Sequence, residues 1–231
     1  MSEPLFDFSH EYDQMLNEGL KLSGEDKEYF VAGRLMELKK RLPAGFSPSR
    51  ILDFGCGTGG TSTALKLMFP DAEIVGVDAS QAALAAARRL NAGEGLSFHD
   101  LADLKPDASF DLCYVNGVFH HIEPERRAEA LALILGSLKA GGYLALFENN
   151  PWNPGTRLVM SRIPFDRDAK TFSIPQARRM LAAAGFDIAS EGNFFYFPRM
   201  LSFLRFSEPA LSFFLPLGAQ YLVLGLKKSS A

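Results

Sequence analysis

Cysteine and histidine are scarce in this chain, which has two cysteines and four histidines among 231 residues. Cys56 lies in a glycine-rich stretch and Cys113 in an apolar run, so the sequence predicts no disulfide framework. No group of cysteines and histidines has the spacing of metal ligands, so no metal site is expected. The shortage of cysteine favours a reducing compartment, and we expect a cytoplasmic protein.

An excess of charge of one sign is also missing. The 24 lysines and arginines nearly balance the 27 aspartates and glutamates, which gives a formal net charge of −3. Domains that bind nucleic acids usually carry a basic face, so this balance argues against a nucleic-acid partner. The first residues are polar and acidic and lack the apolar core of a secretory signal.

Long hydrophobic runs are rare. Residues 209–226 carry no charge and are about as long as a transmembrane helix. Pro209, Pro216 and Gly218 would break a helix there, and Gln220 would add a polar cost. The pattern predicts a short apolar helix, a turn and a final buried strand.

Apolar runs alternate with amphipathic stretches along most of the chain. Strands are predicted at residues 50–54, 73–78, 96–100, 110–117, 143–149, 186–190 and 220–228, helices at 25–42, 61–69, 80–91, 123–140 and 174–185, and a loop at 150–172. Ser80 is a predicted N-cap. This alternation predicts parallel strands with helices on both faces. We expect one domain, with a helical lid at 1–45, a core at 46–150, and substrate-side additions and the last strands at 151–231.

The sequence ILDFGCGTGG sets an acid and spaced glycines between a predicted strand and a predicted helix. Gly55, Gly57 and Gly59 let the backbone turn sharply and approach a ligand beside the free N–H groups of the helix start. The next strand ends in Asp78, where doubly wound folds carry a carboxylate that accepts hydrogen bonds from ribose hydroxyls. The dinucleotide fingerprint is G-x-G-x-x-G, whereas this chain reads G-C-G-T-G-G after Asp53. An acid there suits a cofactor with an ammonium group, so a nicotinamide-dependent oxidoreductase is the less favoured alternative.

Five stretches together resemble the class I S-adenosylmethionine-dependent methyltransferases that act on small molecules. They are DFGCGTGG, VDAS, FHD, FDLCYVNGVFHHI and LKAGGYL, which fall within residues 45–150. The resemblance implies an α/β, Rossmann-like fold with a mostly parallel sheet of seven strands in the order 3-2-1-4-5-7-6, the last strand antiparallel, and helices on both faces. It also implies S-adenosyl-L-methionine as the cofactor and S-adenosyl-L-homocysteine as the product.

The same resemblance assigns residues to the cofactor. They are Asp53, Gly55, Cys56, Gly57, Gly59, Asp78, Ala79, Asp100, Leu101 and Asn116. By this assignment Asp53 and the glycine loop hold the methionine part, and Asn116 borders it. Asp78 holds the ribose, and Asp100 and Leu101 flank the adenine.

Methyl transfer from a sulfonium is an in-line displacement, so much of its rate comes from positioning. A base is needed only if the acceptor is protonated, and His120 and His121, which follow the fourth strand, are the candidates. Alternatively, one of these histidines caps or packs its loop.

The candidates for acceptor binding are Tyr12, Glu148, Asn149, Asn150 and Trp152. An alternative for those after the fifth strand is a turn held by its own side-chain hydrogen bonds.

The segment 194–215 is dense in phenylalanine. Core packing is its favoured interpretation, ahead of an apolar wall around the acceptor and of docking on a membrane surface.

We expect an enzyme that methylates an oxygen of a small apolar, aromatic or lipid-like acceptor, including a glycan-linked one. The alternative is a non-catalytic module that binds the cofactor for a partner enzyme.

Overall fold

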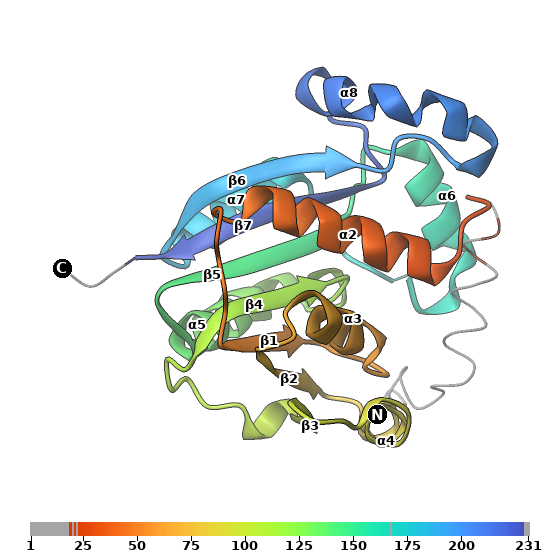
Figure 1. Ribbon diagram of the computed structural model, residues 1–231. Coiled ribbons are helices and arrows are strands. Elements are labelled where there is room, and N and C mark those ends of the chain that lie inside the picture. Colours follow the sequence, from red (N-terminus) through yellow and green to blue (C-terminus); the bar gives the residue numbers. More distant parts are fainter. Residues whose placement is uncertain (1–18, 20, 22, 167, 229–231) are drawn as a thin grey trace.

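Seven strands form one sheet in the order β3-β2-β1-β4-β5-β7-β6, as the resemblance predicts (Figure 1). The computed structural model describes residues 19, 21, 23–166 and 168–228. The strands are β1 (Arg50–Phe54), β2 (Glu73–Asp78), β3 (Leu96–Asp100), β4 (Phe110–Asn116), β5 (Leu138–Asn149), β6 (Phe186–Phe194) and β7 (Gln220–Lys227). Strands β1 to β5 pair in parallel, and β7 runs antiparallel to both β5 and β6.

Helices cover both faces of this sheet. The α-helices are α2 (Lys27–Arg41), α3 (Gly60–Met68), α4 (Gln81–Asn91), α5 (Arg127–Ser137), α6 (Pro154–Arg162), α7 (Ile174–Ala183) and α8 (Glu208–Phe214). The 3₁₀ turns are η1 (Leu101–Asp103), η2 (Phe119–His121), η3 (Pro124–Arg126), η4 (Pro164–Asp166) and η5 (Arg199–Ser207). No helix in the described part of the chain is both long and apolar enough to cross a membrane.

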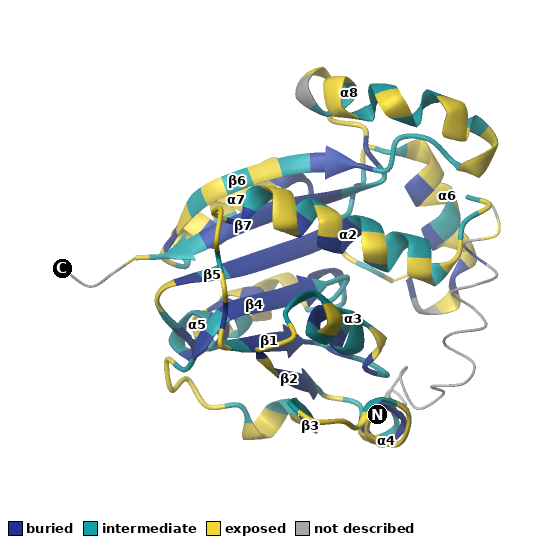
Figure 2. Cartoon of the chain, viewed as in Figure 1, coloured by how far each residue is buried: buried dark blue, intermediate teal, exposed yellow. Residues whose placement is uncertain are grey.

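The core lies on both sides of the sheet, which explains the continuous apolar strands of the sequence. On one face Leu131 and Leu181 pack onto the strands from α5 and α7, and on the other Leu38 and Leu65 pack from α2 and α3. Figure 2 shows the central strands buried and the helices buried along one side. Ser80 caps α4 as predicted, since its hydroxyl accepts a hydrogen bond from the Ala83 amide at 3.2 Å.

Two predicted boundaries are wrong. The helix expected over 123–140 divides into η3 and α5, and Leu138 already belongs to β5, where it pairs with Phe110. The Gly141-Gly142 pair that reads as a helix stop lies within this strand, at an irregularity in the β4–β5 register.

The loop expected over 150–172 contains α6. The Asn153 side chain accepts a hydrogen bond from the Thr156 amide at 2.8 Å, and Pro154 occupies the first turn. This cap followed by proline is a helix-start signal that could have been read from the sequence.

The carboxyl ends of β1, β2, β4 and β5 meet at one edge of the sheet, next to the start of the antiparallel β7 (Figure 1). Helices α2 and α6 and the segment that leads into η5 lie beside this edge. The loops that follow the strands therefore converge there, as in other open α/β sheets.

We expect Tyr221→Phe to lower the free energy of unfolding by about 1–3 kcal/mol. The buried Tyr221 hydroxyl on β7 donates a hydrogen bond to the Phe172 carbonyl at 2.8 Å and so ties the sheet to the segment before α7. Urea unfolding measures the effect. Tyr143→Phe on β5 is the control, since the Tyr143 hydroxyl bonds to no described residue, and an equal effect in both variants would contradict the prediction.

Candidate active site

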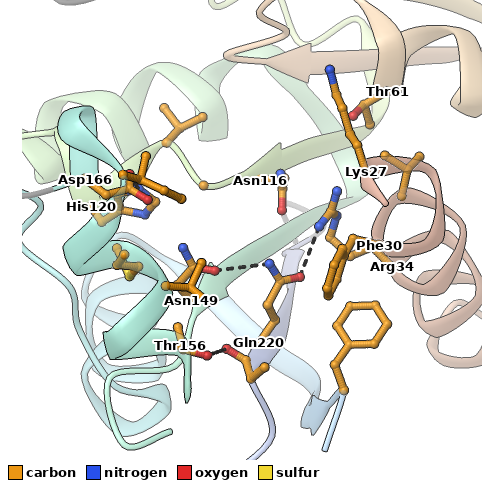
Figure 3. Close-up of a pocket in the computed structure, with 18 of the residues that line it drawn as sticks. Lys27, Phe30, Arg34, Thr61, Asn116, His120, Asn149, Thr156, Asp166 and Gln220 are labelled. Carbon is orange, nitrogen blue, oxygen red and sulfur yellow. Dashed lines mark hydrogen bonds and ion pairs between the residues drawn. The ribbon is translucent and has the colours of Figure 1, made fainter. Parts of the chain in front are cut away.

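A cavity of about 850 Å³ opens where the strand ends converge (Figure 3). Its walls come from the loops after β1, β2 and β4, from α2 and α6, and from residues 195–198. Apolar side chains such as Phe30, Met160 and Ile163 form much of the lining, and a few polar groups are interspersed among them. This composition is typical of a site for a small molecule.

The glycine loop forms one wall of the cavity. The amides of Gly55 and Cys56 donate to the Val77 carbonyl at 2.8 and 3.0 Å, which ties the loop to β2. Gly55 has a φ of +77°, and a Cβ there would lie 2.3 Å from a methyl carbon of Val118. Gly57 has a φ of +53° and open space where its Cβ would be. The loop therefore requires glycine on steric grounds at Gly55 and leaves room for a ligand at Gly57.

Asp78, at the end of β2, holds this loop in place. Its two carboxylate oxygens accept hydrogen bonds from the Gly57 and Ser80 amides, both at 2.8 Å. Asp78 also lines the cavity. Each oxygen keeps a second lone pair, so the carboxylate can still accept hydrogen bonds from a ligand.

Asp53 does not line the cavity. It is 2% exposed beneath the loop and accepts a hydrogen bond from the Ser62 hydroxyl of α3 at 2.6 Å. Burial raises the pKa of this carboxyl to about 7, the Ser62 hydrogen bond opposes the rise, and the charge of Asp78 adds to it. Asp53 therefore joins β1 to α3 beneath the loop, and its contact with the cofactor stays a prediction.

The other residues assigned to the cofactor fall into two groups. Those that line the cavity are Gly55, Cys56, Gly57, Asp78, Ala79, Leu101 and Asn116. Gly59 begins α3 with a φ of +84°, packed closely against Phe98. Asp100 accepts hydrogen bonds from the Gln81 side chain and the Ala102 amide and does not line the cavity.

The predicted acceptor-binding residues are mostly used for other contacts. Asn149 lines the cavity, whereas Glu148, Asn150 and Trp152 do not, and Tyr12 lies outside the described residues. The buried Asn150 amide donates to Asn193 Oδ1 and to the carbonyls of Pro216 and Gly218, and its oxygen accepts from the Trp152 amide. For Asn150 the structure favours the alternative of a turn held by side-chain hydrogen bonds.

His120 lines the opposite wall (Figure 3) and forms a buried pair with Glu148, which lies behind it. His120 Nδ1 lies 2.5 Å from Glu148 Oε2, and Glu148 Oε1 accepts a hydrogen bond from the Phe119 amide at 2.8 Å. Burial lowers the pKa of His120, but the carboxylates of Glu148 and Asp166 raise it more strongly, to about 10. His120 is therefore a cation at neutral pH and cannot accept a proton.

His121 lines the cavity beside this pair. Its Nε2 lies 3.5 Å from Asp166 Oδ1. Burial and the neighbouring His120 lower the pKa of His121 to about 4, so its imidazole is neutral at neutral pH. Of the two predicted bases, only His121 has the protonation state that the role requires.

The aromatic segment divides between three environments: the core, the cavity and the exposed surface. Phe194 belongs to the core, and Phe195 and Phe197 line the cavity. Phe206 and Phe214 are 84% and 83% exposed. Core packing, the favoured prediction, therefore describes only the start of the segment, because most of it turns outward on η5 and α8.

The chain is similar in sequence to known methyltransferases. A family model described as a methyltransferase domain matches residues 52–144. Trans-aconitate 2-methyltransferase of Methylobacterium nodulans is 34% identical over 149 residues, which cover 64% of this chain and 54% of that protein. Demethylmenaquinone methyltransferase of Thermus thermophilus is 31% identical over 172 residues, which cover 63% of this chain and 77% of that protein. The chain belongs to the S-adenosylmethionine-dependent methyltransferases.

Solved structures of this methyltransferase family share the fold. A methyltransferase from Archaeoglobus fulgidus has a TM-score of 0.63 and 19% identity over 87% of this chain and 95% of its own. Phosphoethanolamine N-methyltransferase 2 of Haemonchus contortus, in complex with S-adenosyl-L-methionine, has a TM-score of 0.61 and 18% identity over 86% of this chain and 53% of its own. The cofactor of the family is S-adenosylmethionine. The chain spans about half the length or less of the trans-aconitate 2-methyltransferases that it matches.

Sequence reasoning missed Arg34, Gln220 and Asp166, which line the cavity. Arg34 on α2 is 6% exposed, and its Nη1 donates to Gln220 Oε1 at 3.1 Å (Figure 3). The Arg34 Nε is buried and has no hydrogen-bond partner among the described residues. The sequence carries no signal for this role, because Arg34 reads as one of several basic residues on an amphipathic helix.

We expect Asp53→Asn to remove a decline in stability between pH 4 and pH 7. The pKa of Asp53 is raised in the folded state, so in this window the folded protein binds more protons than the unfolded one and loses stability as the pH rises. A rise of about 3 pKa units corresponds to about 4 kcal/mol. Denaturant unfolding at several pH values measures it, with Asp187→Asn on exposed β6 as the control. Parallel pH curves for Asp53→Asn and the wild type would contradict the assignment.

Proposed function

We propose that this chain transfers the methyl group of S-adenosylmethionine to a small acceptor bound in the same cavity. The main support for the proposal is that one cavity joins two sets of residues. The glycine loop and Asp78 line one part of it, and His121 and Asp166 line another. Small-molecule pockets usually measure about 300–1,000 Å³. A cavity of about 850 Å³ is consistent with a cofactor and a small acceptor lying side by side.

The residues present fit this cofactor. The open space at Gly57 and Gly60 leaves room for the methionine part to approach the backbone. The buried guanidinium of Arg34 lacks a carboxylate partner in the described chain, and the cofactor carries a carboxylate that would pair with it. Asp78 would accept hydrogen bonds from the ribose hydroxyls, and Leu101 would pack against the adenine. When bound, the cofactor supplies an electrophilic methyl group on a sulfonium.

This chain's contribution is to bind, orient and exclude water. Apolar side chains such as Phe30, Phe195 and Phe197 support an acceptor with an apolar or aromatic body. The reacting atom must lie in line with the methyl group at about 3–3.5 Å. We propose an oxygen as this atom, because the neutral His121 lines the cavity and can take the proton of a hydroxyl when no metal ion is present.

Calorimetric titration with S-adenosylhomocysteine tests the proposal first, with NADH as the control. We expect micromolar binding of S-adenosylhomocysteine and none of NADH. Labelled S-adenosylmethionine should then give methylated product with members of a panel of apolar hydroxyl compounds. Cofactor binding without turnover across the panel would favour the non-catalytic module, and absence of cofactor binding would overturn both.

Two variants separate the parts of the cofactor site. We expect Asp78→Ala to weaken binding of both S-adenosylhomocysteine and methylthioadenosine by about 1–3 kcal/mol, because each carries the ribose. We expect Arg34→Met to weaken binding of S-adenosylhomocysteine by about 10- to 100-fold and to leave methylthioadenosine unaffected, because the latter has no carboxylate. Equal losses for both ligands in Arg34→Met would remove the carboxylate assignment, and unchanged affinity in Asp78→Ala would remove the ribose assignment.

A further inference from the structure

Three side chains with metal-ligand chemistry come together on the cavity wall. The ligand atoms of His120, His121 and Asp166 all lie within 4.8 Å of one another in the described structure. Asp166 Oδ1 lies 3.6 Å from His120 Nε2 and 3.5 Å from His121 Nε2. All three residues line the cavity, and Figure 3 shows His120 and Asp166 on the side opposite Lys27 and Arg34.

We propose that His120, His121 and Asp166 bind a divalent transition-metal ion. Two imidazoles and one carboxylate with open positions form a ligand set that such ions prefer. Ligand atoms at about 2.0–2.2 Å from a shared ion lie roughly 3.0–3.6 Å apart, depending on the geometry. The separations of 3.5 and 3.6 Å from Asp166 fall in this range, and all three ligand atoms lie within 4.8 Å of one another in the described structure.

Glu148 provides a second observation in favour of a metal site, because it orients one of the histidines. Its carboxylate accepts a hydrogen bond from His120 Nδ1, so Nε2, which lies 3.6 Å from Asp166 Oδ1, is the nitrogen that would bind an ion in place of its proton. A carboxylate behind a ligating histidine in this way fixes the tautomer and raises the basicity of the ligand. Glu148 is itself 2% exposed and anchored by the Phe119 amide, so the histidine is held rigidly.

Two buried carboxylates lie at the cluster, and the cationic side chain of Arg127 interacts with Glu148. Glu148 and Asp166 are both buried, and within the described ranges neither forms an ion pair with a lysine or arginine. A divalent cation would offset both carboxylates, which supports a cation as the occupant.

The loops that carry the ligands are held together without a metal. Arg127 donates from Nε to the Ile122 carbonyl at 3.0 Å and from Nη2 to the Lys170 carbonyl at 2.5 Å. The Lys170 amide in turn donates to the His120 carbonyl at 2.7 Å. These bonds join the turn with the histidines to the segment after Asp166, so the site is preorganised.

An ion bound by these three residues would have coordination positions left for a ligand from the cavity, because all three residues line it. We infer that the acceptor binds the ion through an oxygen. This step rests on the proposed function. The ion lowers the pKa of a bound acceptor hydroxyl, the proton leaves to solvent, and His121 then acts as a ligand in place of a base. The acceptor oxygen forms a bond to the methyl carbon, the carbon–sulfur bond breaks, and its electron pair stays on sulfur to give a neutral thioether.

Cobalt titration of the full chain tests the site. After treatment with a chelator, we expect one Co²⁺ per chain, seen as visible ligand-field absorption and by calorimetry. We expect His121→Ala and Asp166→Asn to lower Co²⁺ affinity at least 100-fold, and Glu148→Gln to lower it about 10- to 100-fold. His99→Ala is the matched control, since His99 is exposed on β3 and should not change the affinity.

Failure of the metal site can be distinguished from failure of the proposed function. If the wild-type protein does not bind Co²⁺ stoichiometrically, the metal site is wrong, and this result does not depend on any variant. Binding that survives both His121→Ala and Asp166→Asn would also overturn it, and thermal melting shows whether the variants are folded. S-adenosylhomocysteine titrated into the same chelator-treated sample reports on the cofactor site alone, so cofactor binding without Co²⁺ binding leaves the methyltransferase proposal standing.

Discussion

The left-handed turn at Gly55 is the constraint on which the rest of the site depends. It directs the chain from the end of β1 into α3, and the hydrogen bonds of Gly55 and Cys56 to Val77 fix it against β2. Val118, from the loop after β4, packs so closely against Gly55 that a Cβ would displace it. The same turn therefore shapes the glycine loop and sets how close the histidine-bearing loop can come, and both walls of the cavity follow from it.

Acidic residues at the strand ends mainly form hydrogen bonds within the protein. Asp53 joins β1 to α3 through Ser62, Asp78 accepts backbone amides of the glycine loop, and Glu148 holds His120 and the Phe119 amide. Because each buried carboxylate accepts specific donors, its loop is fixed in one conformation. Asp78 also lines the cavity, so it combines this supporting role with access to a ligand.

The fold could be predicted from the sequence in most respects, because its signals are local. Alternating apolar runs gave the parallel strands, Ser80 marked a helix start, and the motif resemblance supplied the strand order. The site could be predicted only where residues follow a strand directly, as in the glycine loop. Arg34 and Asp166 could not be found, because they reach the cavity from α2 and η4, far from any motif in the chain. Asp53 and Asn150 do not line the cavity although they lie next to cavity residues in the sequence, because Asp53 accepts a hydrogen bond from Ser62 and the Asn150 amide donates to the Gly218 carbonyl.

The apolar lining favours some acceptors over others, because it affects how well the charges of the cofactor and the acceptor are solvated. In the proposed reaction the sulfonium is positive, and an acceptor oxygen that has lost its proton is negative, so the transition state already cancels part of both charges. An enclosure of Phe30, Phe195 and Met160 excludes water that would otherwise solvate the separated charges better than the partly neutralised transition state. With an amine acceptor the positive charge would only move from sulfur to nitrogen, and the same enclosure would give less advantage. The apolar walls and the neighbouring His121 therefore support our proposal of an oxygen acceptor over a nitrogen one.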